Sequence, residues 1–349
     1  MNALFDPLTL RGTTFDNRLW VSPMCQYSAN EGVPGAWHLV HLGGLARGGF
    51  GLVLAEATAV TPDGRITRGD TGLWNEWQRG AWARVVDVAH GLGAKIGIQL
   101  SHAGRKASIP VPWSPAPEAR PWTPLAASAL AHPGFPTPYA AEADDLAEVT
   151  AAFAHSARLA VEAGFDAVEL QLAHGFLLHG FLSPLANRRD DGYGGSDDAR
   201  LRFPLEVVAA VRDALGEVPL LARVSSSDWL AGGLEVADVA RIAKRLVAAG
   251  VDLVDVSTAG LLPADVPVGP GYLVPAAEAI RGVVGAPVGV VGLVTGAAQA
   301  EAVVAGDQAD VVLVGRAALR DPQLARRAAH ELGDERVGAW PPQISRGAW

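Results

Sequence analysis

Side chains that can hydrogen-bond or carry charge stand at the ends of several short apolar runs of the sequence. Ser22, Gln99 and Gln171 each close such a run, His174 follows soon after Gln171, and Arg223 lies in the last turn of another run. In a barrel of parallel strands, the carboxyl ends open at a common mouth, where barrel enzymes place their active sites. The pattern therefore predicts a polar site assembled from several separate segments.

Glycines near the end of the chain point to a second kind of chemistry. Val291-Gly292-Leu293 and Val314-Gly315-Arg316 each close an apolar run. Small residues let backbone N–H groups approach a phosphate, and the Arg316 guanidinium supplies the countercharge. We therefore expect a phosphate to bind beside Gly292, Gly315 and Arg316. We expect no metal site, because the closely spaced histidines lack carboxylate or cysteine partners at a consistent spacing.

The apolar runs alternate with helical stretches, an order that is typical of parallel βαβ units. We predict eight strands, at Leu19–Ser22, Leu52–Ala57, Lys95–Leu100, Ala167–Gln171, Leu220–Val224, Leu253–Ser257, Val288–Val291 and Val311–Val314. Eight parallel strands can close into a barrel, whereas a doubly wound sheet usually carries a glycine fingerprint after its first strand, which this sequence lacks. The sequence therefore predicts an α/β fold, a single (β/α)8 TIM barrel that takes up residues 1–349 as one domain.

Two segments depart from this alternation. Leu8–Phe15 has the pattern of a small N-terminal hairpin that closes the barrel bottom. Ser108–Asp144, after the third strand, holds too many prolines for a helix or an inner strand. We predict a long proline-rich loop at the barrel mouth, serving either as a lid over the site or as a structural flap.

Composition and charge exclude several classes of protein. Apolar residues make up 49% of the 349 residues, enough for a sizeable core, and the net charge of −9 opposes binding to nucleic acid. No apolar run approaches the ~20 residues that cross a bilayer, so we expect no membrane partner. The lone cysteine, Cys25, cannot form an internal disulfide, and no signal-like segment opens the chain, so we expect a cytoplasmic location and a small-molecule substrate.

Across essentially its whole length the sequence resembles the Old Yellow Enzyme family, and within it the thermophilic-like bacterial ene-reductase branch that carries a cysteine near the flavin. Any one of the matching stretches would be a weak signal, whereas their ordered set is specific. They are Asn17-Arg18, Ser22-Pro23-Met24-Cys25-Gln26-Tyr27, Gln99-Leu100-Ser101-His102-Ala103-Gly104-Arg105-Lys106, Phe181-Leu182-Ser183-Pro184-Leu185-Ala186-Asn187, Tyr193-Gly194-Gly195-Ser196, Val314-Gly315-Arg316, and the terminal Arg346 with Trp349.

This resemblance implies FMN across the barrel mouth, with NADPH or NADH as the reductant. A cation beside the N1–C2=O edge of the flavin stabilises negative charge on the ring, the role implied for Arg223 with Gln99. The remaining implied cofactor contacts are Ser22, Pro23, Met24, Cys25 and Ala57 around the ring and Gly292, Gly315 and Arg316 at the phosphate. Cys25 would tune the flavin's potential rather than act as a nucleophile, and Tyr27 would line the substrate pocket.

The sequence departs from the family at two positions that matter for catalysis. Relatives hold the substrate's carbonyl oxygen with two histidines, or with a histidine and an asparagine, where this chain has Gln171 and His174. A neutral amide should polarise the carbonyl more weakly than an imidazole does. Relatives also have a tyrosine that protonates the substrate where this chain has Phe176, so Tyr27, Tyr272 or water must supply that proton.

The resemblance also gives the C-terminal residues a role. In this branch a terminal arginine reaches into the active site of a neighbouring subunit. Residues 340–349, with Arg346 and Trp349, are therefore predicted to lie at a subunit interface of a homodimer or homotetramer.

The predicted function is that of an NAD(P)H-dependent flavin oxidoreductase of the ene-reductase type, which passes hydride through flavin N5 to an activated alkene such as an α,β-unsaturated carbonyl. The predicted catalytic residues are Gln171, His174, Tyr27, Cys25 and Phe176. Because Phe176 has no proton to give, a desaturase or a quinone or nitro reductase remains an alternative. A flavin-free phosphate-binding lyase or isomerase is a further alternative.

Overall fold

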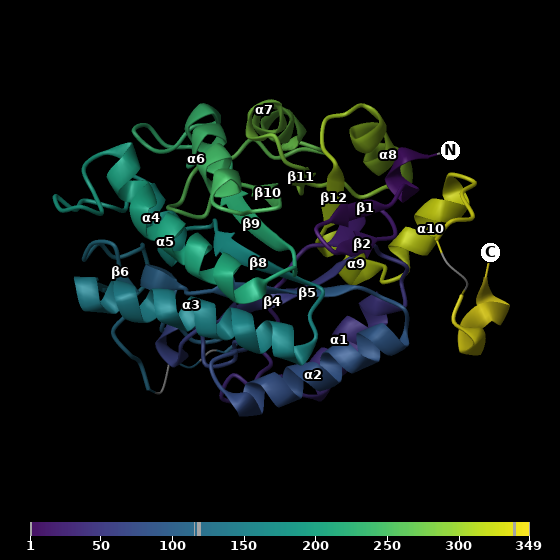
Figure 1. The fold of residues 1–349 in the computed structure, drawn as a ribbon, viewed down its shortest axis with the longest axis horizontal. Coiled ribbons are helices and arrows are strands. Elements are labelled where there is room, and N and C mark those ends of the chain that lie inside the picture. The colour runs from purple at the N-terminus through teal and green to yellow at the C-terminus, as the bar shows by residue number, and fades with distance from the viewer. Residues whose placement is uncertain (1, 115, 117–119, 338–339, 349) are drawn as a thin grey trace.

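The computed structural model of the protein describes residues 2–114, 116, 120–337 and 340–348. Eight parallel strands form a closed barrel in the order β3, β4, β5, β8, β9, β10, β11 and β12 (Figure 1). Their bounds are β3 Leu19–Val21, β4 Val53–Ala59, β5 Ile96–Ser101, β8 Ala167–Leu172, β9 Leu220–Ser225, β10 Leu253–Ser257, β11 Val288–Val290 and β12 Val311–Val314. All eight predicted strands are confirmed, with differences only at their ends.

Helices follow the strands and surround the barrel (Figure 1). The α-helices are α1 Ala36–Ala46, α2 Glu76–Gly91, α3 Ala143–Ala163, α4 Leu177–Leu182, α5 Asp197–Leu215, α6 Val236–Ala248, α7 Val274–Val284, α8 Ala297–Ala305, α9 Arg316–Arg320 and α10 Leu324–Glu331. Short 3-10 helices are η1 Ala3–Phe5, η2 Pro62–Gly64, η3 Gly104–Lys106 and η4 Pro342–Gly347. Among the described residues, no helix combines the length and apolar character needed to cross a membrane.

The lower barrel interior is filled by a layer of apolar side chains. Because side chains alternate along a strand, every second residue points inward, and Trp20, Leu54 and Leu221 pack together there without access to water. The N-terminal hairpin, β1 Leu8–Leu10 paired with β2 Thr13–Phe15, adds Leu10 and Phe15 to the same cluster. The hairpin therefore packs against this end of the barrel, as the sequence predicts.

The proline-rich segment after β5 is the expected long excursion. Its described part contains only the two short paired strands β6 Leu125–Ala126 and β7 Tyr139–Ala140 before α3 begins. Ile109 and Trp122 from this excursion pack against an apolar cluster next to Cys25 and Tyr27. The excursion therefore covers one side of the barrel mouth.

Candidate active site

A polar layer lies above the apolar floor of the barrel. Its members are Gln99, Glu169, Arg223 and Asp255, which all point inward and are at most 4% exposed. Strand register sets Gln99 beside Glu169 and Arg223 beside Asp255. Sequence reasoning found Gln99 and Arg223 but missed the two carboxylates. The available signal was the two-residue period, which puts Glu169 on the same face as Gln171.

Hydrogen bonds and ion pairs fix the orientation of this layer. Arg223 donates from Nε to Asp255 Oδ2 at 2.6 Å and from Nη2 to Ser22 Oγ at 2.7 Å, and its Nε lies 3.6 Å from Glu169 Oε1. Gln99 Nε2 donates to Glu169 Oε1 at 2.7 Å. Among the described residues, no hydrogen-bond partner is found for Nη1 of Arg223. Arg223 also lines a cavity that lies above the polar layer.

That cavity has a volume of about 340 Å³ and extends from the polar layer to the barrel rim. Its lining includes Arg223 of β9 and His174 after β8, together with residues that precede α7 or follow β11 and β12, namely Tyr272, Gly292, Gly315, Arg316 and Arg320. Gly292 has φ +141°, a backbone conformation that side chains rarely adopt. Neither Arg316 nor Arg320 forms an ion pair with a described residue, so two guanidiniums face the cavity without an acidic partner. This arrangement suits an anion such as a phosphate.

Gln171 and His174 lie side by side at the end of β8. Gln171 Nε2 lies 3.3 Å from His174 Nδ1, and His174 Nε2 lies 2.7 Å from Ser257 Oγ. Because an amide nitrogen donates, Nδ1 accepts and the imidazole proton sits on Nε2. Burial, together with the charges of Arg223 and Lys106, holds the pKa of His174 well below its usual value, so the ring is neutral at pH 7.

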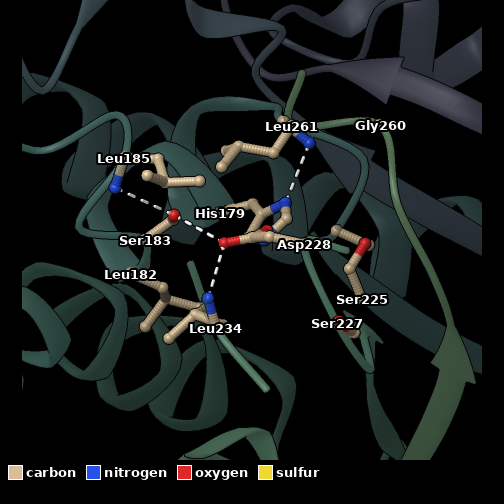
Figure 2. A network of polar contacts seen from close by, with 12 residues as sticks. His179, Leu182, Ser183, Leu185, Ser225, Ser227, Asp228, Leu234, Gly260 and Leu261 are labelled. Atoms are coloured by element: carbon tan, nitrogen blue, oxygen red, sulfur yellow. Dashed lines mark hydrogen bonds and ion pairs between the residues drawn. The ribbon is translucent and has the colours of Figure 1, made fainter. Parts of the chain in front are cut away.

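A buried network holds the backbone of His174 in place. His174 has φ +60° and Gly175 has φ +77°, so both lie in the left-handed region. His179 Nδ1 accepts the Gly175 N–H at 2.9 Å, and its Nε2 lies 3.1 Å from Asp228 Oδ1 (Figure 2). Asp228 in turn accepts from Ser183 Oγ at 2.7 Å. This network therefore fixes the turn that carries His174.

A second imidazole–carboxylate pair supports the segment that follows β3. His38 Nδ1 accepts the Gly35 N–H at 3.0 Å, and its Nε2 lies 3.2 Å from Glu56 Oε1. Glu56 Oε2 accepts the N–H of Gln26 at 2.8 Å, and Gln26 stands between Cys25 and Tyr27. Sequence reasoning missed this support, because neither partner lies near Gln26 in the chain.

Cys25, Tyr27 and Phe176 gather in one apolar cluster, and none of the three lines the cavity that Arg316 and Arg320 line. Burial and the negative charges of Asp70 and Glu56 raise the pKa of the Cys25 thiol, which opposes a nucleophilic thiolate. Burial also raises the pKa of Tyr27, so its hydroxyl keeps its proton at neutral pH. Ala57 pairs with Gln99 across β4 and β5.

The other predicted site residues are more widely spread. Pro23 and Met24 are partly buried after β3, and a side chain at Gly315 would meet the Met24 sulfur at 3.5 Å. Lys106, at the end of the matching stretch that begins with Gln99, donates to the backbone oxygens of His174 at 2.9 Å and Gly260 at 3.0 Å. Arg346 is exposed on η4, at the periphery beside α10, and Trp349 lies outside the described residues (Figure 1).

Comparison with known proteins places this barrel in a family. The NADH:flavin oxidoreductase / NADH oxidase family matches residues 3–335. The chain belongs to this family. The match confirms the resemblance to the Old Yellow Enzymes, while the cysteine near the flavin stays a prediction.

Individual members of the family cover the whole chain. An NADPH dehydrogenase of Listeria monocytogenes serotype 4a is 44% identical over 351 residues, which cover 100% of both chains. Another NADPH dehydrogenase, from Geobacillus thermodenitrificans, is 44% identical and covers 99% of this chain and 98% of its own. The solved structure of morphinone reductase in complex with tetrahydroNAD superposes with a TM-score of 0.80 at 29% identity, over 95% of this chain and 90% of that one.

Membership of the NADH:flavin oxidoreductase family makes the protein an NAD(P)H-dependent flavin oxidoreductase with FMN as its cofactor. The cavity residues fit that group. Two arginines without acidic partners, Arg316 and Arg320, suit the phosphate, and Arg223 presents a donor to the same cavity. This agreement argues against the flavin-free lyase or isomerase.

Proposed function

We propose that the protein reduces activated alkenes, with FMN bound in the cavity that joins Arg223 to Arg316. The observation that carries this proposal is that one cavity is lined both by Arg223 and His174 and by two arginines without acidic partners, Arg316 and Arg320. Gln171 lies next to this lining, 3.3 Å from His174 Nδ1. A cofactor with a polar ring and a phosphate tail requires both ends. When bound, FMN supplies the hydride chemistry.

In this proposal each predicted cofactor-binding residue contacts a particular part of FMN. Gln99 and Arg223 meet the pyrimidine edge of the ring, and Ser22 orients the guanidinium through its 2.7 Å bond. Pro23, Met24 and Ala57 give backbone and apolar contacts to the ring. Gly292, Gly315 and Arg316 hold the phosphate.

Gln171 and His174 hold the oxygen of the substrate carbonyl. The amide nitrogen of Gln171 already donates to Gln99 Oε1 at 3.2 Å and lies near His174 Nδ1, and His174 Nε2 pairs with Ser257. A substrate oxygen must therefore compete with protein partners for these donors. Because both groups are neutral, they orient the carbonyl more than they polarise it.

Because Phe176 has no proton to give, another group must protonate the substrate after hydride transfer. Tyr27 is the best candidate among the protein's side chains. Tyr27 shares a cluster with Phe176 and Cys25, whereas Tyr272 lines the phosphate end of the cavity beside Arg316. A phenol with a raised pKa releases its proton reluctantly. Because proton transfer from Tyr27 is unfavourable, quinone or nitro reduction, or the reverse desaturation, is the second candidate function.

The proposal includes a homodimer, or a pair of such dimers, in which Arg346 reaches the neighbouring active site. Helix α1 is apolar on its outer face, with Trp37 51% and Val40 72% exposed, and Trp77 at the start of α2 is 76% exposed. A helix that is apolar all round usually packs on a second surface as well. Arg346, exposed on η4, would have to cross to a second copy to reach an active site.

Reduction by NADPH followed by anaerobic reoxidation tests this function. Holoenzyme is reduced with one equivalent of NADPH and then mixed with cyclohexenone, a quinone or a nitroarene. We expect cyclohexenone to restore the oxidised spectrum and give cyclohexanone. Reoxidation by the quinone and the nitroarene alone would instead support the second candidate function.

A further inference from the structure

Two fully buried carboxyl groups share a single guanidinium in the polar layer. Glu169 and Asp255 are each 0% exposed, and both lie within salt-bridge distance of Arg223, at 3.6 and 2.5 Å. The remaining member of this layer, Gln99, is neutral, and so is Ser22, which Arg223 contacts. With both carboxyls ionised the cluster would carry one uncompensated negative charge, which is costly away from water.

Each of the two carboxyls also has one oxygen with a hydrogen-bond partner and one oxygen without. Glu169 Oε1 and Asp255 Oδ2 have partners, whereas Glu169 Oε2 and Asp255 Oδ1 are buried without a recorded hydrogen-bond partner among the described residues. Two acceptors cannot bond to each other, but one proton placed between them satisfies both. Both carboxyls lie against the same nitrogen of Arg223, with Nε 3.6 Å from Glu169 Oε1 and 2.6 Å from Asp255 Oδ2.

We infer that Glu169 and Asp255 hold one proton between them, and that this proton lets Arg223 act as an electrostatic support for the flavin. Asp255 carries the negative charge that pairs with the guanidinium, and Glu169 is the neutral acid. The cluster then has no net charge, so Arg223 can attract negative charge on the ring. The inference rests on the proposed placement of the pyrimidine edge at Gln99 and Arg223.

The charged groups around Glu169 agree with this assignment. Burial raises the pKa of Glu169 well above its usual value and the charge of Asp255 adds to this, while Arg223 opposes it. The facing residues are Gln99 on β5 and Ser22 directly after β3, and His174, two residues beyond β8, is itself neutral. Glu169 and Asp255 act as positioning residues through Arg223 and Gln99.

Single and double replacements distinguish a shared proton from two ionised carboxyls. In Glu169→Gln or Asp255→Asn the remaining carboxylate pairs with Arg223, and only the shared proton is lost. We expect the midpoint potential of bound FMN at pH 7 to move little in either single variant. It should rise in the double variant, because no carboxylate there offsets the positive charge of Arg223. If both carboxyls are ionised, each single variant also loses one negative charge. A clear rise in each single variant, even one smaller than the rise in the double variant, would therefore overturn the inference.

Infrared spectroscopy of the holoenzyme tests the proton itself and does not depend on where the flavin lies. Burial also raises the pKa of Asp70 to about 7, so the spectra are compared well above that pH. There we expect the wild type to keep the C=O stretch of a buried carboxylic acid, and both single variants to lack it. Glu162→Gln, an exposed carboxyl on α3, should change neither the band nor the potential. A wild type without the band would overturn the inference even if the double variant fails to fold. The band with an unchanged potential in a folded double variant would overturn the proposed placement of the flavin instead.

Discussion

His179 lies between the turn that carries His174 and the buried carboxylate of Asp228. One ring nitrogen accepts the Gly175 N–H at 2.9 Å, and the other lies 3.1 Å from Asp228 Oδ1 (Figure 2). Since Nδ1 accepts, the proton is on Nε2, next to the carboxylate. Asp228 is 1% exposed and also accepts the Leu234 N–H at 2.8 Å.

Asp228 should make the protein sensitive to acid. Burial alone would raise the pKa of Asp228, but hydrogen bonding to His179, Leu234 and Ser183 outweighs it and holds the pKa below its usual value. Its stabilisation is then complete above the unfolded pKa of about 3.9 and is lost as the pH falls through the lower folded value. Urea unfolding should show Asp228→Asn less stable at pH 7 by about 2 kcal/mol, with the difference shrinking in strong acid. A difference that stays constant with pH, or an equal loss in the exposed control Asp265→Asn, would argue against this role.

His174→Ala should weaken the binding of phenolic ligands. Removing one hydrogen-bonding partner of the ligand oxygen costs about 1.4 kcal/mol, or about tenfold in affinity. The absorbance change of oxidised FMN on titration with 4-hydroxybenzaldehyde measures it. His155→Ala, an exposed histidine on α3, is the control and should bind as the wild type does. Equal affinity in His174→Ala would remove His174 from the ligand site.

Phe176→Tyr should accelerate reduction of cyclohexenone. Phe176 is 8% exposed, next to Cys25 and Tyr27, and a phenol there restores the proton donor of the family. A positioned general acid typically contributes on the order of a hundredfold, so the oxidative half-reaction should gain at least about tenfold. Phe176→Leu tests for packing alone and should show no gain. If Tyr27→Phe slows the wild type while Phe176→Tyr changes nothing, the proton already comes from Tyr27.

The barrel could be predicted from the sequence because its signal is local. β-branched runs such as Val311–Val314 are separated by helical stretches, and each run is buried on both faces. The polar strand ends Gln99 and Arg223 could be predicted for the same reason, since the carboxyl ends of parallel strands share one mouth.

The supports of the site could not be predicted in this way. Asp228 lies 49 residues after His179 in the sequence. Their contact depends on how the turn after β9 folds over α4. Glu169 and Asp255 are different, because their inward positions follow from the two-residue period of β8 and β10. The distances from these two carboxyls to Arg223 could not be predicted from the sequence. Those distances decide whether a buried carboxyl keeps its proton.

Removing residues 345–349 should weaken substrate affinity without lowering the FMN content. Arg346 is exposed on η4, so its proposed contact is with a second copy of the chain. The Michaelis constant for cyclohexenone should rise in the truncated protein and in Arg346→Ala. Gln343→Ala, exposed on the same short helix, is the matched control. Unchanged substrate affinity together with unchanged oligomer mass in the truncated protein would contradict the proposed interface.

Steady-state kinetics with NADPH and cyclohexenone varied together test the central claim most directly. The claim is that one FMN in the cavity between Arg223 and Arg316 is reduced by NADPH and then reoxidised by the alkene in the same place. Double-reciprocal plots should give parallel lines, with high cyclohexenone inhibiting competitively against NADPH. Intersecting lines, or no turnover of cyclohexenone by a protein that NADPH reduces, would contradict it.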